Sequence, residues 1–220
     1  MRPVPDVVRA LRLYLVAGPD DCPGWPLAEV VTAAARGGAG MVQLRHKGVP
    51  TADLAAEARA LMAMLEPLGV PLLVNDDPYA ALEAGAHGVH LGQQDMDPRE
   101  ARRILGPDAV IGWTVKTPEQ AREAASMGVD YVGVGPVYAS TTKPDAGRVL
   151  ALEGVVRMRG ATDLPMVAIG GIMPGRAGVA VRAGADGVAV VSAVCAADNP
   201  EAATRTLLAE IDAALGGSAA

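Results

Sequence analysis

The chain has 220 residues, of which half are hydrophobic, 26 are glycine and 17 are proline, and its net charge is −6 at pH 7. The apolar content excludes a disordered chain, and the glycines lack the strict triplet period of collagen. The acidic balance argues against nucleic acid or an anionic membrane surface as the partner.

The cysteines and the N-terminus indicate the compartment. Cys22 and Cys195 lie far apart in the sequence without a CxxC motif, which is typical of reduced thiols. The basic start of the chain has no adjoining apolar stretch of signal-peptide length, and no run of 18 apolar residues occurs. We therefore expect a soluble, cytoplasmic protein.

Short apolar runs alternate with Ala-rich segments of helical period, such as Thr51–Leu68 and Glu119–Met127. Eight strands are predicted in chain order, at Arg12–Val16, Met41–Arg45, Pro71–Asn75, Gly88–Leu91, Val110–Thr114, Tyr131–Gly135, Met166–Gly170 and Val188–Ser192. This alternation predicts a parallel sheet covered by helices, and eight units in a chain of this length match a (β/α)8 TIM barrel. No low-complexity linker interrupts the chain, so we expect one α/β domain over 1–220, with 1–10 and 216–220 as frayed tails.

Proline and glycine mark the helix ends. Four helix starts pair a capping side chain with proline, namely Asp77-Pro78, Asp97-Pro98, Thr117-Pro118 and Asn199-Pro200. A Gly-Ala/Val-x-x-Val pattern recurs at 38–42, 85–89, 128–132 and 184–188, each time before an even-numbered strand. We expect each of these glycines to close a helix in the left-handed conformation.

Charged residues gather where the second strand ends. Gln43, Arg45 and Lys47 share one strand parity, so their side chains point the same way if the strand continues. Active sites of TIM barrels form at this end of the strands, and converging cations suit a phosphate or pyrophosphate. A salt bridge at the rim of the barrel is the alternative.

Carboxylates follow the next two strands. Asn75 and Asp76 end the third strand, and Asp95 lies in the loop after the fourth. Two carboxylates on neighbouring loops suit a magnesium site, although turn or cap carboxylates explain the spacing equally well. His90, in the apolar fourth strand, is interpreted as a packed, hydrogen-bonded histidine rather than a ligand.

A second set of anion-binding groups follows the later strands. Ser140, Thr142 and Lys143 come after the sixth strand, where the lysine suits a phosphate contact better than a Schiff base. Gly170 and Gly171 follow the seventh strand, and Val191 and Ser192 end the eighth. Glycine there lets backbone N–H groups approach a phosphate, or serves only a tight turn.

Five stretches resemble the thiamine phosphate synthase family and fall in order along the chain: VQLRHKG (42–48), VNDDPYAALEAGAHGVHLGQQD (74–95), DYVGVGPVYASTTK (130–143), AIGGI (168–172) and GADGVAVVSAV (184–194). The resemblance implies a transferase on a TIM barrel. It would join 4-amino-2-methyl-5-hydroxymethylpyrimidine diphosphate to 4-methyl-5-(2-phosphoethyl)thiazole, or its carboxylated form, releasing pyrophosphate and thiamine phosphate. The implied cofactor is Mg²⁺, and a homodimer is left open as the oligomeric state.

The resemblance also assigns roles to residues. The pyrimidine diphosphate would contact Gln43, Arg45, Lys47, Asn75, Thr114 and Lys143. The thiazole phosphate would contact Ser140, Thr142, Gly171, Val191 and Ser192. Magnesium would bind Asp76 and Asp95, and catalysis would depend on Lys143, Arg45 and Thr114. We expect the pyrimidine to lose pyrophosphate as a cation that the thiazole nitrogen then attacks.

The chain departs from the family pattern at three positions. Ser140 replaces the usual threonine, Ala139 a frequent proline, and Lys116 a histidine after the fifth strand. The related thiazole tautomerases use a histidine near that last position, so its loss, with both aspartates retained, favours the synthase. A tautomerase-like isomerase and a non-catalytic binder of thiamine precursors are the alternatives.

Overall fold

Eight parallel strands form a closed barrel in the computed structural model, which describes residues 6–139 and 147–216. The strands pair in sequence order, and β1 pairs with β8 to close the barrel. They are β1 (Leu13–Ala17), β2 (Met41–Leu44), β3 (Leu72–Asn75), β4 (Gly88–Leu91), β5 (Val110–Val115), β6 (Tyr131–Val134), β7 (Met166–Ile169) and β8 (Gly187–Val190). All eight strands are those that the sequence predicts, and the TIM barrel is confirmed.

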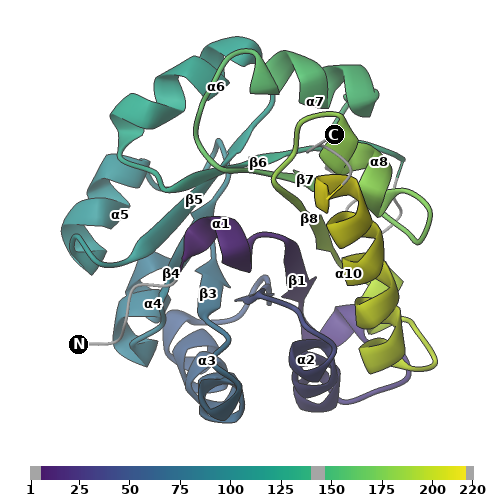
Figure 1. The fold of residues 1–220 in the computed structure, drawn as a ribbon. Helices are drawn as coiled ribbons and strands as arrows, with labels where there is room; N and C mark the ends of the chain where they lie inside the picture. Colours follow the sequence, from purple (N-terminus) through teal and green to yellow (C-terminus); the bar gives the residue numbers. More distant parts are fainter. Residues whose placement is uncertain (1–5, 140–146, 217–220) are drawn as a thin grey trace.

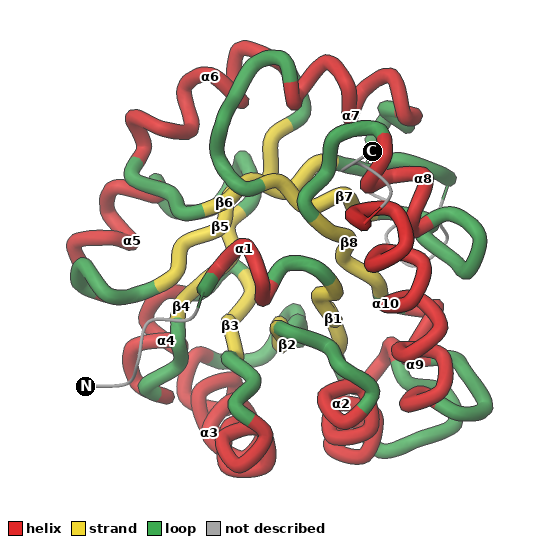
Figure 2. The backbone as a smooth tube through the Cα atoms, in the orientation of Figure 1, coloured by secondary structure: helices red, strands yellow, loops and turns green. Residues whose placement is uncertain are grey.

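Helices surround this barrel on the outside (Figure 1). Figure 2 shows the ring of helices in red around the strands in yellow. The outer helices are α2 (Leu27–Arg36), α3 (Thr51–Leu65), α4 (Pro78–Ala84), α5 (Pro98–Leu105), α6 (Pro118–Ala124), α7 (Ala151–Arg159), α8 (Ala177–Arg182) and α10 (Pro200–Gly216). Shorter elements are α1 (Val7–Ala10), α9 (Ser192–Cys195) and the 3-10 turns η1 (Pro19–Asp21), η2 (Glu66–Leu68) and η3 (Ala125–Met127).

The predicted helix signals act as expected. The side chains of Asp77, Asp97, Thr117 and Asn199 each accept a hydrogen bond from a backbone N–H in the first turn of the following helix. The glycines that open the repeated pattern all have positive φ, at +103° for Gly38, +67° for Gly85, +71° for Gly128 and +111° for Gly184. Local chemistry thus sets where helices begin and end.

The N-terminal segment differs from the expectation of a frayed tail over 1–10. Residues 7–10 form α1, and the Asp6 side chain caps this helix through the N–H of Arg9. Ala10 and the following Leu11 are buried in an apolar cluster inside the barrel. The helix lies across the near end of the barrel in Figure 1. Its apolar contacts with the interior cover the N-terminal end of the strands.

Two apolar clusters result from the alternation of strand side chains. The larger cluster lies between the sheet and the helices and includes Val42 and Leu44. The smaller one lies inside the barrel, where its large side chains include Tyr14, Met41 and Tyr131. Since neighbouring strand residues face opposite sides, Gln43 points inward, as its parity predicts.

Candidate active site at the barrel mouth

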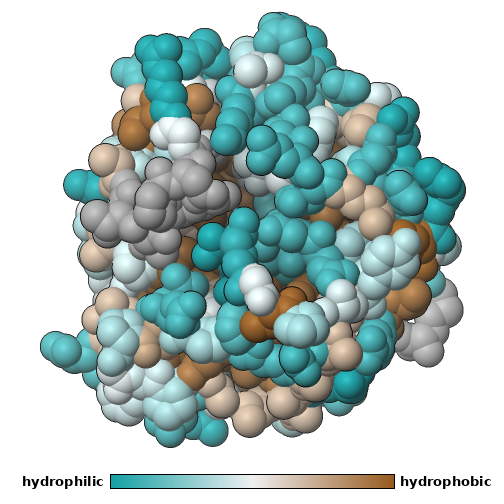
Figure 3. All heavy atoms as spheres, turned by 180° about the vertical axis from the view of Figure 1, so that it is seen from behind, coloured by the Kyte–Doolittle hydropathy of each residue, from teal (hydrophilic) through white to brown (hydrophobic). Residues whose placement is uncertain are grey.

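A pocket of about 530 Å³ opens at the carboxyl ends of the strands. This volume lies in the range of small-molecule sites. Seen from the side opposite α1, hydrophilic side chains gather around the centre of this face (Figure 3). Ten of the predicted site residues line the pocket: Gln43, Arg45, Lys47, Asn75, Asp76, Asp95, Thr114, Gly171, Val191 and Ser192. Ser140, Thr142 and Lys143 lie outside the described residues.

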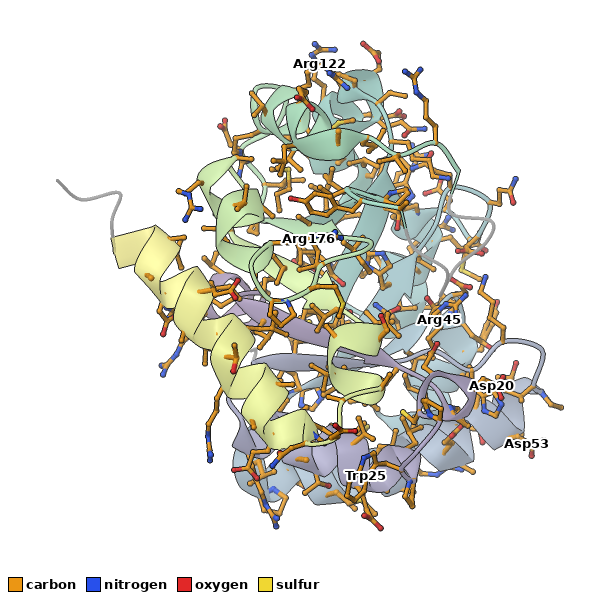
Figure 4. The ribbon with its side chains drawn as sticks, turned by 90° about the vertical axis from the view of Figure 1, so that its right-hand side faces the viewer. Asp20, Trp25, Arg45, Asp53, Arg122 and Arg176 are labelled. Atoms are coloured by element: carbon orange, nitrogen blue, oxygen red, sulfur yellow. The ribbon has the colours of Figure 1, made fainter. Side chains whose placement is uncertain are left out.

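The cationic side of the pocket is built on β2 and the loop after it. Arg45 follows the strand, and its N–H donates to the carbonyl of Ala17 at 2.8 Å, which extends the pairing with β1. In the side view, Arg45 lies at the same end of the molecule as Asp20, which belongs to η1 after β1 (Figure 4). Lys47 Nζ lies 3.4 Å from Asp76 Oδ2. Arg45, Lys47 and the Gln43 amide therefore line one pocket, as their shared strand parity predicts.

Asp76 and Asp95 form an acidic pair beside Lys47. Burial, together with the nearby Asp95 carboxylate, raises the pKa of Asp76 from 3.8 to about 6, although Lys47 opposes this. Asp76 has a left-handed φ of +65°, and Asp95 Oδ2 accepts a hydrogen bond from the N–H of Gly92. Two carboxylates held this close repel each other, and a divalent cation is a group that relieves such repulsion.

The opposite side of the pocket is formed by the loops after β6, β7 and β8. Gly170 and Gly171 have φ values of +99° and +62°. A Cβ at Gly171 would lie 2.6 Å from the carbonyl oxygen of Ala139, so this position has no room for a side chain. Ser192, at the start of α9, is exposed at the pocket. Backbone groups can therefore approach an anion closely here.

Arg176 contacts both the turn at Gly171 and the loop that carries Tyr138. Its Nη1 donates to the carbonyl of Gly171 at 2.8 Å, and its guanidinium carbon lies 4.6 Å from the centre of the Tyr138 ring. Tyr138 is itself tied to the same turn, because its N–H donates to the carbonyl of Gly170 at 2.9 Å. Arg176 therefore connects the loops that follow β6 and β7.

Sequence reasoning missed part of the pocket lining. Tyr14, Gln93 and Lys116 line the pocket. So does His90, which is hydrogen-bonded inside the barrel as expected but also faces the site. The inward parity of Tyr14 on β1 was a usable signal. Lys116, which stands in place of the histidine of the family pattern, does reach the site.

This arrangement offers two anion-binding regions in one pocket. One has two cations and an acidic pair, and the other has glycine backbone and a serine hydroxyl. Of the titratable groups that line its described part, the pKa is clearly shifted for Asp76 and for the buried Tyr14. The two cations, the glycine backbone and the serine hydroxyl equip the site to position and charge-stabilise phosphorylated ligands.

A family profile described as thiamine monophosphate synthase matches residues 13–194, which include all eight strands. The chain belongs to the thiamine monophosphate synthase family. The match begins with β1 and ends in α9, so every element that lines the pocket lies within the matched region of the family.

Relatives and solved structures agree with membership in this family. A thiamine-phosphate synthase of Albidiferax ferrireducens is 50% identical over 206 residues, covering 94% of both chains. One of Xanthobacter autotrophicus is 48% identical over 204 residues, covering 93% of this chain and 97% of the relative. The thiamine phosphate pyrophosphorylase of Pyrococcus furiosus superposes with a TM-score of 0.87 at 34% identity, covering 96% of this chain and all of that one. More distant barrels share the fold alone: 3-hexulose-6-phosphate synthase has a TM-score of 0.65 at 16% identity, covering 90% of this chain and 99% of the other.

Proposed function

We propose that this chain couples 4-amino-2-methyl-5-hydroxymethylpyrimidine diphosphate with 4-methyl-5-(2-phosphoethyl)thiazole, or its carboxylated form, and releases thiamine phosphate and pyrophosphate. Membership in the thiamine monophosphate synthase family supports this reaction. The observation that carries the proposal is the single pocket with a cation-rich and a glycine-rich region, since the reaction needs two phosphorylated substrates side by side.

The pyrimidine diphosphate is assigned to the side of the pocket formed by β2 and β3. Arg45 and Lys47 would neutralise its phosphate oxygens, and Asn75 would donate a side-chain hydrogen bond. Asp76 and Asp95 would hold Mg²⁺. Both side chains line the pocket and Asp95 contributes to the raised pKa of Asp76, which fits a dication with few carboxylates and a diphosphate to complete its shell. When bound, Mg²⁺ would supply positive charge for the diphosphate leaving group.

The thiazole phosphate is assigned to Gly171, Val191 and Ser192, with Ser140 and Thr142 as further partners. The positive φ of Gly171 and the lack of space for a Cβ support a close approach of backbone to phosphate. This placement would hold the thiazole nitrogen toward the pyrimidine carbon that loses pyrophosphate.

Positioning and charge stabilisation are proposed to drive the reaction. Arg45, Lys47 and Lys143 would stabilise the departing pyrophosphate, while the pyrimidine becomes a cation aided by its amino group. The thiazole nitrogen would then form the new C–N bond, with Thr114 contacting the pyrimidine. No catalytic base is needed in this step.

We also place the enzyme in the cytoplasm. Cys22 and Cys195 are buried free thiols, which suits a reducing compartment. Over the described residues, the structure has no helix long and apolar enough to span a membrane.

Calorimetric titration tests the assignment of the two substrates. We expect pyrimidine diphosphate to bind only weakly without Mg²⁺ and at least tenfold more tightly with it, whereas thiazole phosphate binding should not depend on the metal. If the protein binds the thiazole phosphate but no pyrimidine diphosphate, with or without Mg²⁺, the result would instead indicate an isomerase of the thiazole.

A further inference from the structure

A continuous chain of hydrogen bonds crosses the interior of the barrel below the pocket. Gln43 Nε2 lies 2.6 Å from the Tyr14 hydroxyl, which lies 3.0 Å from the Tyr131 hydroxyl. The Tyr131 hydroxyl lies 2.8 Å from His90 Nδ1, and His90 Nε2 lies 2.9 Å from Thr114 Oγ1. The chain joins β2, β1, β6, β4 and β5, and its two ends are the residues assigned above to the pyrimidine.

Two strand glycines make room for this chain. A Cβ at Gly112 would lie 2.1 Å from Cζ of Tyr131, and a Cβ at Gly133 would lie 3.1 Å from Cε1 of His90. Both glycines sit within β-strands, where glycine is otherwise unfavourable. The interior of the barrel is therefore shaped around the rings of Tyr131 and His90.

The two tyrosines keep their protons. Burial is the main cause that raises the pKa of Tyr14 and of Tyr131 above the ordinary value of 10.0. Each phenol therefore has one proton and can donate one hydrogen bond, while it can accept others. This restriction allows the direction of the chain to be worked out from one end.

The donor and acceptor of each hydrogen bond can be assigned starting from Gln43. The amide nitrogen can only donate, so the Tyr14 hydroxyl accepts from it. Among the described residues, the other hydrogen-bonding partner of the Tyr14 hydroxyl is Tyr131, so the Tyr14 proton is donated there. The reverse direction would leave a fully buried proton without an acceptor, which is unfavourable.

The direction of the hydrogen bonds at the Thr114 end of the chain follows in the same way. The Tyr131 proton goes to His90 Nδ1, so the proton of the neutral imidazole is on Nε2. Nε2–H then donates to Thr114 Oγ1, which leaves the Thr114 proton directed away from His90 and toward the pocket that Thr114 lines. At the opposite end, Gln43 uses its nitrogen within the chain, so its carbonyl oxygen is left as an acceptor at the pocket.

We propose that Tyr14, Tyr131 and His90 are positioning residues that make Thr114 a donor and Gln43 an acceptor toward the pyrimidine. An aminopyrimidine has the complementary pattern, with an amino group that donates and ring nitrogens that accept. The amino group would donate to Gln43 Oε1, and a ring nitrogen would accept from Thr114 Oγ1. This inference rests on the proposed function only for the identity of the ligand, because the direction of the chain is a property of the free protein.

The tautomer of His90 tests the direction without any substrate. The chain has three histidines, so ¹⁵N-histidine labelling with a His90→Gln variant identifies the His90 signals. We expect a protonated Nε2 and an unprotonated, acceptor-type Nδ1 near pH 7.5. A protonated Nδ1 with an unprotonated Nε2 would mean that Thr114 donates to His90, and a doubly protonated ring would mean that His90 donates to Tyr131; either result would overturn the proposal whatever the enzyme catalyses.

Removing single hydroxyls tests the consequence for the substrate. Tyr131→Phe keeps the ring but removes the donor to His90, so we expect kcat/KM for the pyrimidine diphosphate to fall at least tenfold. The KM for the thiazole phosphate should not change, and the Nδ1 signal of His90 should show loss of the hydrogen bond from Tyr131. Tyr79→Phe, on the exposed surface of α4, is the matched control and should change none of these values.

Substrate analogues test the hydrogen-bond pattern itself. Replacing the ring nitrogen that faces Thr114 by CH should weaken binding to the native enzyme about tenfold and leave binding to Thr114→Val unchanged. If each ring nitrogen can be replaced in turn without loss, or if Tyr131→Phe behaves like Tyr79→Phe, the positioning role is refuted.

Discussion

Asp76→Asn should stabilise the metal-free protein at pH 7.5, because it removes a carboxylate that the folded state holds unfavourably. In the folded protein, burial and Asp95 raise the pKa of Asp76 from 3.8 to about 6. The folded state therefore binds this proton more tightly than the unfolded state does, and stability is lost as the pH rises from about 4 to about 6. Asparagine has no such charge and also tolerates the positive φ at this position.

The size of this effect follows from the difference in pKa. A difference of about 2 corresponds to about 3 kcal/mol in the free energy of unfolding. The Asp76 side chain is 30% exposed, so solvent screening reduces the expected gain to about 1–2 kcal/mol. The gain should be complete at pH 7.5 and small near pH 4, where the folded state still holds the proton and the unfolded state, with a pKa of 3.8, is about half protonated.

Urea unfolding at pH 4, 6 and 7.5 in the presence of a chelator measures the gain. Asp97→Asn is a matched control with the opposite sign, because hydrogen bonds from Arg99 lower the pKa of Asp97 to about 2. That variant should lose stability at pH 7.5. Asp76→Asn could prove no more stable than the native protein at pH 7.5, or its full gain could persist at pH 4. Either result would mean that burial and Asp95 do not disfavour the ionised Asp76 in the folded state.

Three further variants test the pocket. The double variant Asp76→Ala with Asp95→Ala should lower turnover at saturating Mg²⁺ by at least a hundredfold, while its circular dichroism spectrum stays native. A native rate would contradict the proposed metal site. Arg176→Ala should raise the KM for the thiazole phosphate about tenfold and leave the KM for the pyrimidine diphosphate unchanged in steady-state assays, because it frees the Gly171 turn; equal changes in both values would contradict this role. Gly171→Ala places a Cβ 2.6 Å from the carbonyl of Ala139 at a φ of +62°, so calorimetry should show at least tenfold weaker binding of the thiazole phosphate; unchanged affinity would argue against backbone contact there.

The parts of the fold that depend on neighbouring residues could be predicted from the sequence. A capping side chain before proline acts within one helical turn, so Asp77 and Asp97 marked helix starts reliably. Strand parity likewise placed Gln43, Arg45 and Lys47 in the pocket, because alternation of side chains is a local property. The resemblance to the thiamine phosphate synthase family then gave a reason for these groups to gather at one end of the barrel, namely the binding of a diphosphate.

The parts that depend on distant contacts were missed. Tyr14 and Tyr131 lie 117 positions apart, and no local sequence pattern indicates that their hydroxyls meet. The expectation of a hydrogen-bonded His90 is confirmed, but its place at the pocket was missed, because its partners come from β5 and β6. The sequence does not predict the short helix α1, since the burial of Leu11 depends on closure of the barrel. Each of these features requires strands that pair only in the folded protein.

Formation of thiamine phosphate tests the account most directly. The purified protein is incubated with the pyrimidine diphosphate, the thiazole phosphate and Mg²⁺, and the product is oxidised to its fluorescent form and quantified. We expect fluorescent product in proportion to enzyme, lost when Mg²⁺ or either substrate is omitted. A native, folded protein that yields no product under these conditions, or yields it at the same rate with a chelator present, would contradict the proposed reaction at this pocket.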